Sequence, residues 1–173
     1  MSGQPDIVVL DAAAAKAAIP QLAEVLADCV QGGASVNFML PYNAGDAAKF
    51  FDKAVASVMR GDTILLAAKV DDRIVGTVQL GLDTPPNQPH RAEVKKMLVH
   101  RSARDKGVGT ALLAAVEQQA RSKGRTLLVL DTASDAAMRL YERGGWQKLG
   151  TIPDYALWPG GGFCDSTYYW KKL

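Results

Sequence analysis

A glycine-containing turn between an apolar strand and an amphipathic helix is the feature that most constrains this chain. The apolar segment 97–99 leads through Arg104-x-x-Gly107-x-Gly109 directly into a helical pattern. Glycine lets the backbone approach a ligand closely, and the N–H groups of a first helical turn have no partner within the helix. With the positive end of the helix dipole they form a site for an anion, typically a pyrophosphate. A tight turn without a ligand also needs glycine, so both interpretations stay open here.

Two common nucleotide-binding motifs do not match this turn. A Rossmann fingerprint has a third glycine about three residues after Gly109, where this chain has Leu112. A Walker A loop ends in Gly-Lys followed by Ser or Thr, which the turn lacks. Charge nevertheless favours an anionic ligand: residues 1–90 contain six Lys or Arg against ten Asp or Glu, whereas residues 91–173 contain fourteen against eight. The basic runs are short and lack interleaved aromatic residues, so they favour a phosphorylated cofactor over nucleic acid; a solvated surface is the alternative.

Length and composition indicate an ordinary globular protein. The 173 residues are 48% apolar and 22% charged, which suits one domain over residues 1–173 with a core of its own. Apolar runs fall short of the roughly 20 residues that span a bilayer, and the first residues lack the pattern of a signal peptide. Two cysteines, Cys29 and Cys164, and two histidines make neither a disulfide framework nor a metal-ligand set. We therefore expect a cytoplasmic protein with no metal and no membrane association.

Strand and helix patterns interleave along the chain without repeats or a linker. Apolar residues at three-and-four spacing predict helices, in which Pro20 is expected only near a first turn, whereas short β-rich segments predict strands. Residues 151–164, with Pro153, Pro159 and three consecutive glycines, predict an irregular loop. The result is an α/β (α+β) domain with flanking helices and a mixed sheet of about seven strands. The expected helices cover 19–29, 46–59, 107–122 and 134–143, and the expected strands cover 7–10, 63–70, 74–80, 92–99, 126–131, 146–150 and 167–173.

Two motifs in order resemble the GNAT superfamily of acetyl-CoA-dependent N-acetyltransferases. Arg104, Gly107 and Gly109 match its Arg/Gln-x-x-Gly-x-Gly/Ala motif, and residues 137–146 resemble its Ala-x-x-Leu/Phe-Tyr-x-x-x-Gly-Phe/Trp block. The resemblance implies the GNAT fold, with acetyl-CoA as co-substrate. Segments 32–36, 91–96, 128–132 and 169–173 are similar to the tabtoxin-resistance group, whose enzymes acetylate a small amine-bearing toxin.

The resemblance also implies roles for residues on the cofactor side. Tyr141 would be the general acid toward the CoA sulfur; the alternative is a core aromatic residue. Ser134 stands where many GNAT proteins have Asn, and we assign it to the cofactor site. Backbone groups of Met97, Leu98 and Val99 would pair with the pantetheine arm, and those of Arg104, Asp105, Lys106, Gly107, Val108, Gly109 and Thr110 would hold the pyrophosphate.

Two carboxylates are candidates for the acceptor side. Strand alternation predicts that Glu93 shares a face with Met97 and Val99, from where it could take a proton from an ammonium. The alternative is an ion pair with Lys95 or Arg91. Asp131 ends an apolar strand, where burying a carboxylate is unfavourable unless it has a partner. Asp131 could bind the ammonium or cap the following helix. Together they would hold a small cationic amine in a closed acidic pocket.

Two loops would line the acceptor cleft in a GNAT fold. Gly33, Ser35 and Asn37 lie between the first two helices, where a simple helix-breaking turn is the alternative, and Trp158 lies in the tail loop. We expect an N-acetyltransferase for the primary amine of a small, amino-acid-like molecule, such as a toxin or antibiotic, acting as a monomer or homodimer. The alternatives are acetylation of protein N-termini or lysines, and a non-catalytic CoA-binding module.

Overall fold

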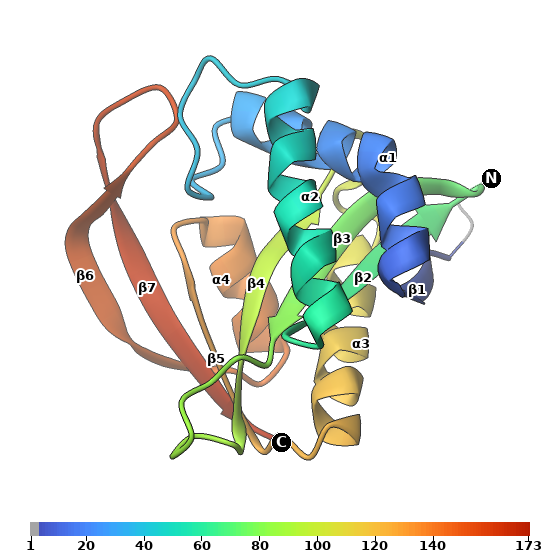
Figure 1. Ribbon diagram of the computed structural model, residues 1–173. Helices are drawn as coiled ribbons and strands as arrows, with labels where there is room; N and C mark the ends of the chain where they lie inside the picture. Colours follow the sequence, from blue (N-terminus) through green and yellow to red (C-terminus); the bar gives the residue numbers. More distant parts are fainter. Residues whose placement is uncertain (1–3) are drawn as a thin grey trace.

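The computed structural model describes residues 4–173 as a seven-stranded sheet with helices on both faces (Figure 1). The strand order is β1-β2-β3-β4-β5-β7-β6, and all neighbours are antiparallel except β4 and β5. This confirms the predicted mixed α/β architecture. The strands are β1 (Asp6–Leu10), β2 (Thr63–Val70), β3 (Arg73–Gly81), β4 (Arg91–Val99), β5 (Leu127–Thr132), β6 (Gln147–Leu157) and β7 (Phe163–Lys172). The helices are α1 (Ala12–Gln31), α2 (Ala44–Arg60), α3 (Val108–Ser122) and α4 (Asp135–Arg143), with a 3-10 turn at Arg101–Ala103.

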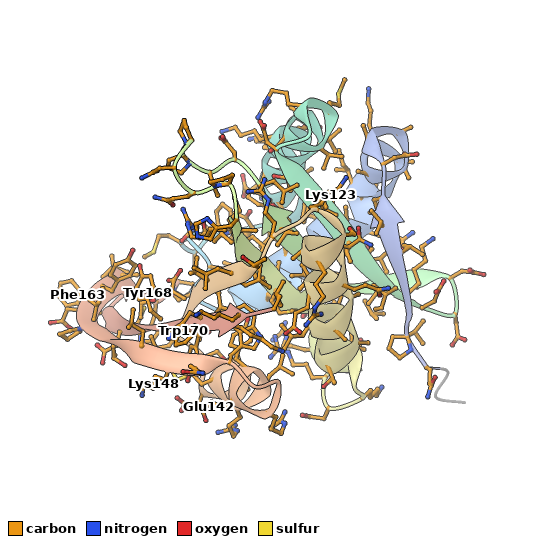
Figure 2. All side chains as sticks on the ribbon, turned by 90° about the horizontal axis from the view of Figure 1, so that it is seen from below. Lys123, Glu142, Lys148, Phe163, Tyr168 and Trp170 are labelled. Atoms are coloured by element: carbon orange, nitrogen blue, oxygen red, sulfur yellow. The ribbon has the colours of Figure 1, made fainter. Side chains whose placement is uncertain are left out.

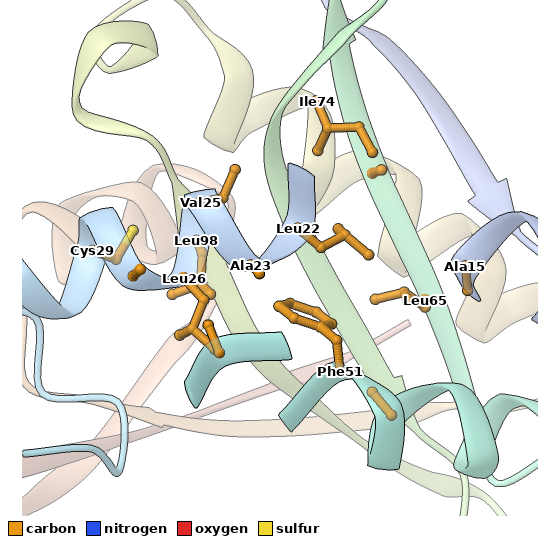
Figure 3. Packing of buried hydrophobic residues seen from close by; sticks show 14 of the residues in the cluster. Ala15, Leu22, Ala23, Val25, Leu26, Cys29, Phe51, Leu65, Ile74 and Leu98 are labelled. Atoms are coloured by element: carbon orange, nitrogen blue, oxygen red, sulfur yellow. The ribbon is translucent and has the colours of Figure 1, made fainter. Parts of the chain in front are cut away.

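The central strands are buried on both faces because each face carries its own apolar cluster. On β2, Leu65 and Ala67 pack into the cluster under α1 and α2, whereas Leu66 and Ala68 pack into the cluster under α3. Figure 3 shows the first cluster, in which Phe51 of α2 lies beside side chains of α1, β2 and β4. The alternation of a strand and the spacing of amphipathic helices thus produce a three-layer domain.

β4 and β5 pair only at their beginnings. Their parallel register covers Arg91–Glu93 against Leu127–Val129 and then stops, although β4 continues to Val99 and β5 to Thr132. Beyond this point the edge of β4 that faces β5 has no strand partner. A sheet that separates in its middle leaves backbone N–H and C=O groups free to bind an extended ligand.

The prediction that Pro20 lies near the start of a helix is wrong, because α1 begins eight residues earlier, at Ala12. Asp11 caps this helix by accepting a hydrogen bond from the Ala14 N–H at 2.8 Å. A proline inside a helix removes one backbone hydrogen bond and typically costs about 3 kcal/mol. Here Pro20 is exposed, while Leu22 and Leu26 are fully buried against the sheet, so tertiary packing stabilises a helix that local preference would shorten.

The predicted irregular loop over residues 151–164 is wrong. β6 extends from Gln147 to Leu157, pairs with β7 along an edge of the sheet, and leaves only a short connection around residues 158–162. Proline is compatible with an edge strand or a bulge because its missing N–H is not needed there. The register shifts between Ile152 and Ala156, and Asp154 has a positive φ of 52°, so Pro153 sits in an irregularity of an edge strand.

Candidate active site

The predicted phosphate turn forms a continuous segment that ends at the N-terminus of α3. Gly107 is the N-cap residue with φ of 78°, a conformation that favours glycine, and it makes no side-chain cap. The first backbone hydrogen bond into the helix runs from the Ala111 N–H to the Gly107 carbonyl at 3.0 Å. The N–H groups of Val108, Gly109 and Thr110 therefore precede the hydrogen-bonded helix and are available to an anion.

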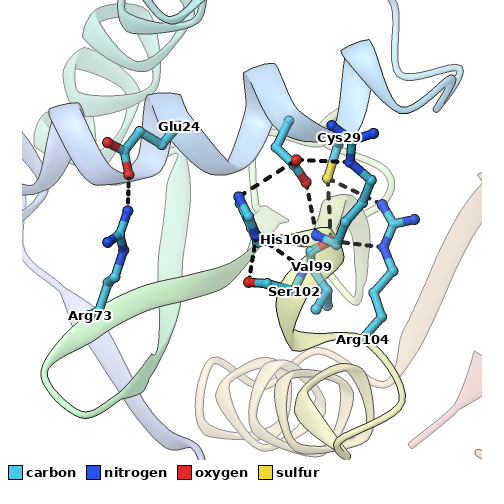
Figure 4. Close-up of polar contacts among 9 residues, drawn as sticks. Glu24, Cys29, Arg73, Val99, His100, Ser102 and Arg104 are labelled. Carbon is cyan, nitrogen blue, oxygen red and sulfur yellow. Dashed lines mark hydrogen bonds and ion pairs between the residues drawn. The ribbon is translucent and has the colours of Figure 1, made fainter.

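Side chains anchor this turn to β4 and α1 rather than reaching outward (Figure 4). The Arg104 Nε donates to the Val99 carbonyl at 3.1 Å, and its Nη2 contacts the Cys29 sulfur at 3.8 Å. Asp28 accepts hydrogen bonds from the Arg101 backbone N–H and Nε at 2.8 and 2.9 Å. Burial alone would raise the pKa of Asp28, but the bonds from Arg101 outweigh it and the pKa lies below its usual value. The turn is thus held in place before any ligand binds.

The free edge of β4 begins beside this turn. His100 donates its N–H to the Val75 carbonyl at 2.8 Å, and Val99 lies opposite Gly76. In an antiparallel pair successive residues point their backbone groups to opposite sides, so the N–H and C=O of Val99 face away from β3. The N–H faces the gap toward β5, where the resemblance places the pantetheine arm, whereas the C=O already accepts hydrogen bonds from the Arg104 Nε and the Cys29 thiol.

β4 contains a bulge at Lys96 and Met97. The register with β3 shifts between Thr77 and Gln79, and Lys96 has φ of 51°. A bulge inserts one residue, bends the strand and changes which face the following side chains occupy. Bulges of this kind are frequent next to active sites, and this one lies beside the place where β4 and β5 separate.

The bulge makes one prediction about Glu93 wrong. Val94 packs into the α3-side core, whereas Leu98 packs into the cluster under α1 and α2, so the face reverses between them. Met97 and Val99 pack against the α3-side core, and Glu93 lies on the opposite face. Simple alternation predicted a shared face because an inserted residue in a strand is invisible in the sequence pattern.

Asp131 and Glu93 nevertheless occupy the same face of the sheet. Glu93 lies opposite Val129 in the parallel register, and Asp131 is two residues further along β5. Asp131 accepts a hydrogen bond from the Ser166 hydroxyl of β7 at 2.7 Å. It does not cap α4, as the alternative supposed, because Ser134 is the N-cap residue and accepts from the Ala137 N–H at 3.3 Å.

Tyr141 is a buried residue of α4 that lies close to Asp131. Its side chain is only 4% exposed and packs against Trp146 and Tyr169, with ring centroids 5.7 and 6.0 Å apart. Burial, together with the Asp131 carboxylate, raises the pKa of Tyr141 well above its usual value. The phenol therefore keeps its proton across neutral pH, a state in which it can donate one.

The two predicted acceptor loops contact one another across the chain. The Ser35 hydroxyl donates to the Leu157 carbonyl at 3.1 Å, and the Cys164 thiol donates to Ser35 at 3.3 Å. The Leu40 N–H donates to the Pro159 carbonyl at 2.9 Å, next to Trp158, which is 38% exposed. The loop between α1 and α2 and the tip of the β6–β7 hairpin are thereby joined. Gly33 and Asn37 both have positive φ angles, of 95° and 80°, that shape the first loop.

A family model described as "Acetyltransferase (GNAT) family" matches residues 34–146. This range contains the α3 turn, the bulged β4 strand and α4. The chain belongs to this family. The predicted superfamily is therefore confirmed.

Several relatives agree with this assignment. N-acetyltransferase 8B of Homo sapiens is 35% identical over 86 residues, which are 48% of this chain and 38% of that protein. IAA acetyltransferase of Azospirillum brasilense is 31% identical over 101 residues, which are 57% of this chain and 64% of that protein. Each match thus spans less than two thirds of the relative's own length.

Solved structures share the fold at low sequence identity. An N-acetyltransferase from Staphylococcus aureus Mu50 superimposes with a TM-score of 0.81 at 18% identity, covering 98% of this chain and 99% of that one. A phosphinothricin acetyltransferase from Sinorhizobium meliloti, solved in complex with AcCoA, gives 0.78 at 17% identity, covering 99% and 89%. Similarity at this level shows the GNAT fold alone.

The gap between β4 and β5 and the turn before α3 suit acetyl-CoA in their chemistry. The unpaired edge of β4 matches an arm that carries amide groups, and the free N–H groups at α3 match a pyrophosphate. Asp105 carries the carboxylate of the turn, and its side chain is exposed. Within residues 4–173, groups of three or more His, Cys, Asp or Glu side chains placed to hold a metal ion are absent. Among the same residues, none of the helices is long and apolar enough to cross a membrane.

The predicted closed acidic pocket needs correction. Glu93 lines a cavity of about 150 Å³ whose walls carry both signs of charge, including Arg60, Lys95 and Asp62, and Asp131 is not part of this lining. In the structure described for residues 4–173, the Glu93 carboxylate forms no ion pair within 4.0 Å, so the predicted pairing with Lys95 or Arg91 is not made. The two carboxylates share a face of the sheet rather than one acidic chamber.

A lysine and several aromatic residues of this region were not predicted from the sequence. The Lys96 ammonium lies 5.8 Å from the ring centroids of both Phe38 and Phe50. Tyr168 of β7 lies opposite Asp131 and donates its hydroxyl hydrogen to Tyr155 at 2.9 Å; in Figure 2 it lies along β7 between Phe163 and Trp170. These residues come from five separate segments, and no spacing in the sequence connects them.

Proposed function

We propose that this protein is an acetyl-CoA-dependent N-acetyltransferase that acts on the primary amine of a small, amino-acid-like molecule. The observation that carries the proposal is the separation of β4 and β5, which leaves three parts in this region of the sheet. These are the free edge of β4, the Asp131 carboxylate and the buried Tyr141 phenol. Such a site offers a place for a thioester, an attractor for an ammonium and a proton donor.

The cofactor side uses mainly backbone groups. Met97, Leu98 and Val99 would hold the pantetheine arm through the open β4 edge, and the turn from Arg104 to Thr110 would hold the pyrophosphate. Ser134 lies at the start of α4, where its hydroxyl already caps the helix. When bound, acetyl-CoA supplies the acetyl thioester.

The side chains of this protein would then bind the ammonium and transfer the protons. Glu93 and Asp131 attract the ammonium, and one of them accepts its first proton, which leaves a neutral amine as the nucleophile; the second proton leaves the nitrogen for solvent as the amide forms. A C–N bond forms, the C–S bond breaks, and Tyr141 gives its proton to the departing sulfur. Because the pKa of Tyr141 is raised, the phenol can then recover a proton from solvent at neutral pH.

The contact between the two acceptor loops supports a small acceptor over a peptide. Hydrogen bonds from Ser35 to Leu157 and from Leu40 to Pro159 join the loops, whereas a peptide substrate needs an open groove. The similarity to the tabtoxin-resistance group, the single domain over residues 1–173, the cytoplasmic location and a monomeric or homodimeric state stay predictions. A CoA-binding module without catalysis is the alternative from another functional class.

A panel of amines tests the proposal. The purified protein is incubated with acetyl-CoA and single amines, including amino acids, polyamines and a lysine-containing peptide, and free thiol is followed over time. We expect turnover with small amines and not with the peptide. Turnover with the peptide alone would replace the proposal by protein acetylation, and CoA binding without turnover on any amine would favour the non-catalytic module.

A further inference from the structure

Lys96 lies beside the rings of Phe38 and Phe50, on the face of the sheet that carries Glu93 and Asp131. Within residues 4–173 its ammonium makes neither a hydrogen bond nor an ion pair, although the side chain is largely withdrawn from solvent. Burial, with Lys95 close by, lowers the pKa of Lys96, while Asp131 and Glu93 act in the opposite direction. Lys96 is half-buried, and an ammonium without an oxygen partner among the described residues is available to an anionic ligand.

Lys171, another partly buried lysine, is an example of a lysine with a structural role. Lys171 bonds both carboxylate oxygens of Glu117, at 3.0 and 2.8 Å, and the Gly144 carbonyl at 2.7 Å. Glu117 also accepts a hydrogen bond from the Trp146 indole at 2.9 Å. All charge in that cluster is satisfied within the protein. Lys96 has no comparable set of partners and instead lies over two phenyl rings.

The backbone holds Lys96 in this place at an energetic cost. Its φ of 51° is uncommon for a residue with a side chain, and it belongs to the bulge of β4. Without the extra residue, regular alternation would place position 96 on the α3-side face with Val94. The bulge turns the side chain to the face of Glu93 and Asp131, where it contacts Phe38 and Phe50.

We propose that Lys96 binds an anionic group of the acceptor, so that the preferred acceptor carries a carboxylate a few bonds from its amine. This inference rests on the proposed function and narrows its substrate class. Glu93 and Asp131 attract the ammonium, and the unpaired Lys96 ammonium on the same side of the sheet receives the carboxylate. The phenyl rings of Phe38 and Phe50 pack against the lysine from the other side. A peptide N-terminus or a protein lysine lacks a carboxylate at that distance, so the same lysine disfavours both.

Matched pairs of amines isolate the carboxylate. The pairs are glycine and glycinamide, β-alanine and β-alaninamide, and L-methionine and L-methioninamide. We expect wild-type protein to acetylate at least one acid with higher kcat/KM than its amide. Lys96→Met should reduce that preference by about 10-fold or more, mainly through KM, because an ion pair with a hydrogen bond is lost. Comparing the ratio between variants cancels the different basicities of acid and amide.

Three variants serve as controls. Lys148→Met, which changes an exposed lysine of β6, should keep the preference. Lys96→Arg should retain part of it because the cation remains. Lys96→Met should fold with an equal or higher Tm because it removes an unpaired, desolvated charge, whereas Lys171→Met should lower Tm because it leaves Glu117 without its partner.

Calorimetry separates this inference from the proposed function. Protein saturated with CoA is titrated with the acid and the amide of each pair, a measurement that needs no turnover. Tighter binding of an acid by wild type, lost in Lys96→Met, supports the inference even where thiol release contradicts catalysis. Equal preference in wild type and Lys96→Met, in both binding and turnover, would overturn the role of Lys96 while leaving acetyl transfer intact.

Discussion

The proposed cofactor side and the proposed acceptor side of this protein are built in opposite ways. The cofactor side consists of backbone groups from one continuous stretch, from Met97 to Thr110, held in shape by Gly107 and by the contact between Asp28 and Arg101. The acceptor side consists of side chains from β4, β5, β7 and the loop after α1, and its centre is a bulged residue. One is a local motif and the other exists only after folding.

This difference corresponds to two tasks: binding a cofactor that is the same for all members of the family, and recognising an acceptor that differs between members. A pyrophosphate and an amide-bearing arm are the same in every acetyl-CoA, and free N–H groups bind them whatever the neighbouring side chains are. An acceptor is recognised by charge and shape, which depend on the identity of a few side chains. Changes on the cofactor side should therefore weaken CoA binding, whereas changes on the acceptor side should spare it.

The largest expected effect belongs to Tyr141, the proposed general acid. Tyr141→Phe should lower kcat by about 10²–10⁴-fold, because general acid catalysis typically contributes that much, and should leave the Kd for CoA unchanged. The raised pKa of Tyr141 keeps the phenol protonated through neutral pH, so the loss should be the same from pH 6 to pH 9. Stopped-flow measurement of the chemical step checks this. An unchanged rate would make Tyr141 a packing residue only.

Gly109→Glu should have the next largest effect and act on the cofactor side alone. A carboxylate at the α3 N-terminus opposes the pyrophosphate, and repulsion of about 3 kcal/mol at close range corresponds to about 100-fold weaker CoA binding. An added Cβ would meet the flexible end of Leu140 at 3.2 Å, which allows the variant to fold.

Gly109→Gln is the matched control, with the same shape and no charge. Calorimetry with CoA should show a much smaller loss for Gln than for Glu. Equal affinity of wild type and the folded Glu variant would contradict the placement of the pyrophosphate on this turn.

On the acceptor side, Glu93→Gln and Asp131→Asn should divide two roles. Substitution of the carboxylate that accepts the proton should lower kcat by about 100-fold. Substitution of a carboxylate that only attracts the ammonium should raise KM by about 10-fold. Both variants should bind CoA like wild type. Asp165→Asn, which changes an exposed carboxylate of β7, serves as control. Wild-type kcat/KM in both single variants would remove Glu93 and Asp131 from the acceptor site.

The smallest expected effect comes from Asp28→Asn, which loosens the anchor of the α3 turn. Losing a charged hydrogen bond to Arg101 should cost roughly 1 kcal/mol, or about 5-fold in CoA affinity. Because the folded pKa of Asp28 is lowered, its stabilisation is complete above the ordinary value of 3.8 and is lost as pH falls through the folded pKa. The difference in Tm between wild type and variant should therefore be constant near neutral pH and shrink in acid.

Much of the fold was predictable because its signals are local. Apolar spacing located all four helices, and β-rich segments located the strands of the central sheet. The errors share one cause: Pro20 lies inside α1 and Pro153 inside β6, although local rules exclude proline from both places. Packing of α1 on the sheet and pairing of β6 along an edge override those rules, and neither can be seen from neighbouring residues.

The sequence by itself determined the cofactor side. Arg104, Gly107 and Gly109 stand in one stretch, and a strand that leads into a glycine turn and a helix leaves the same N–H groups free wherever it occurs. Only the tertiary structure decided the acceptor side. One inserted residue in β4 places Glu93 and Met97 on opposite faces of the sheet. It also turns Lys96, with its positive φ, toward Phe38 and Phe50. A bulge depends on the register between two strands, and register arises from pairing across the sheet rather than from the order of residues along one strand.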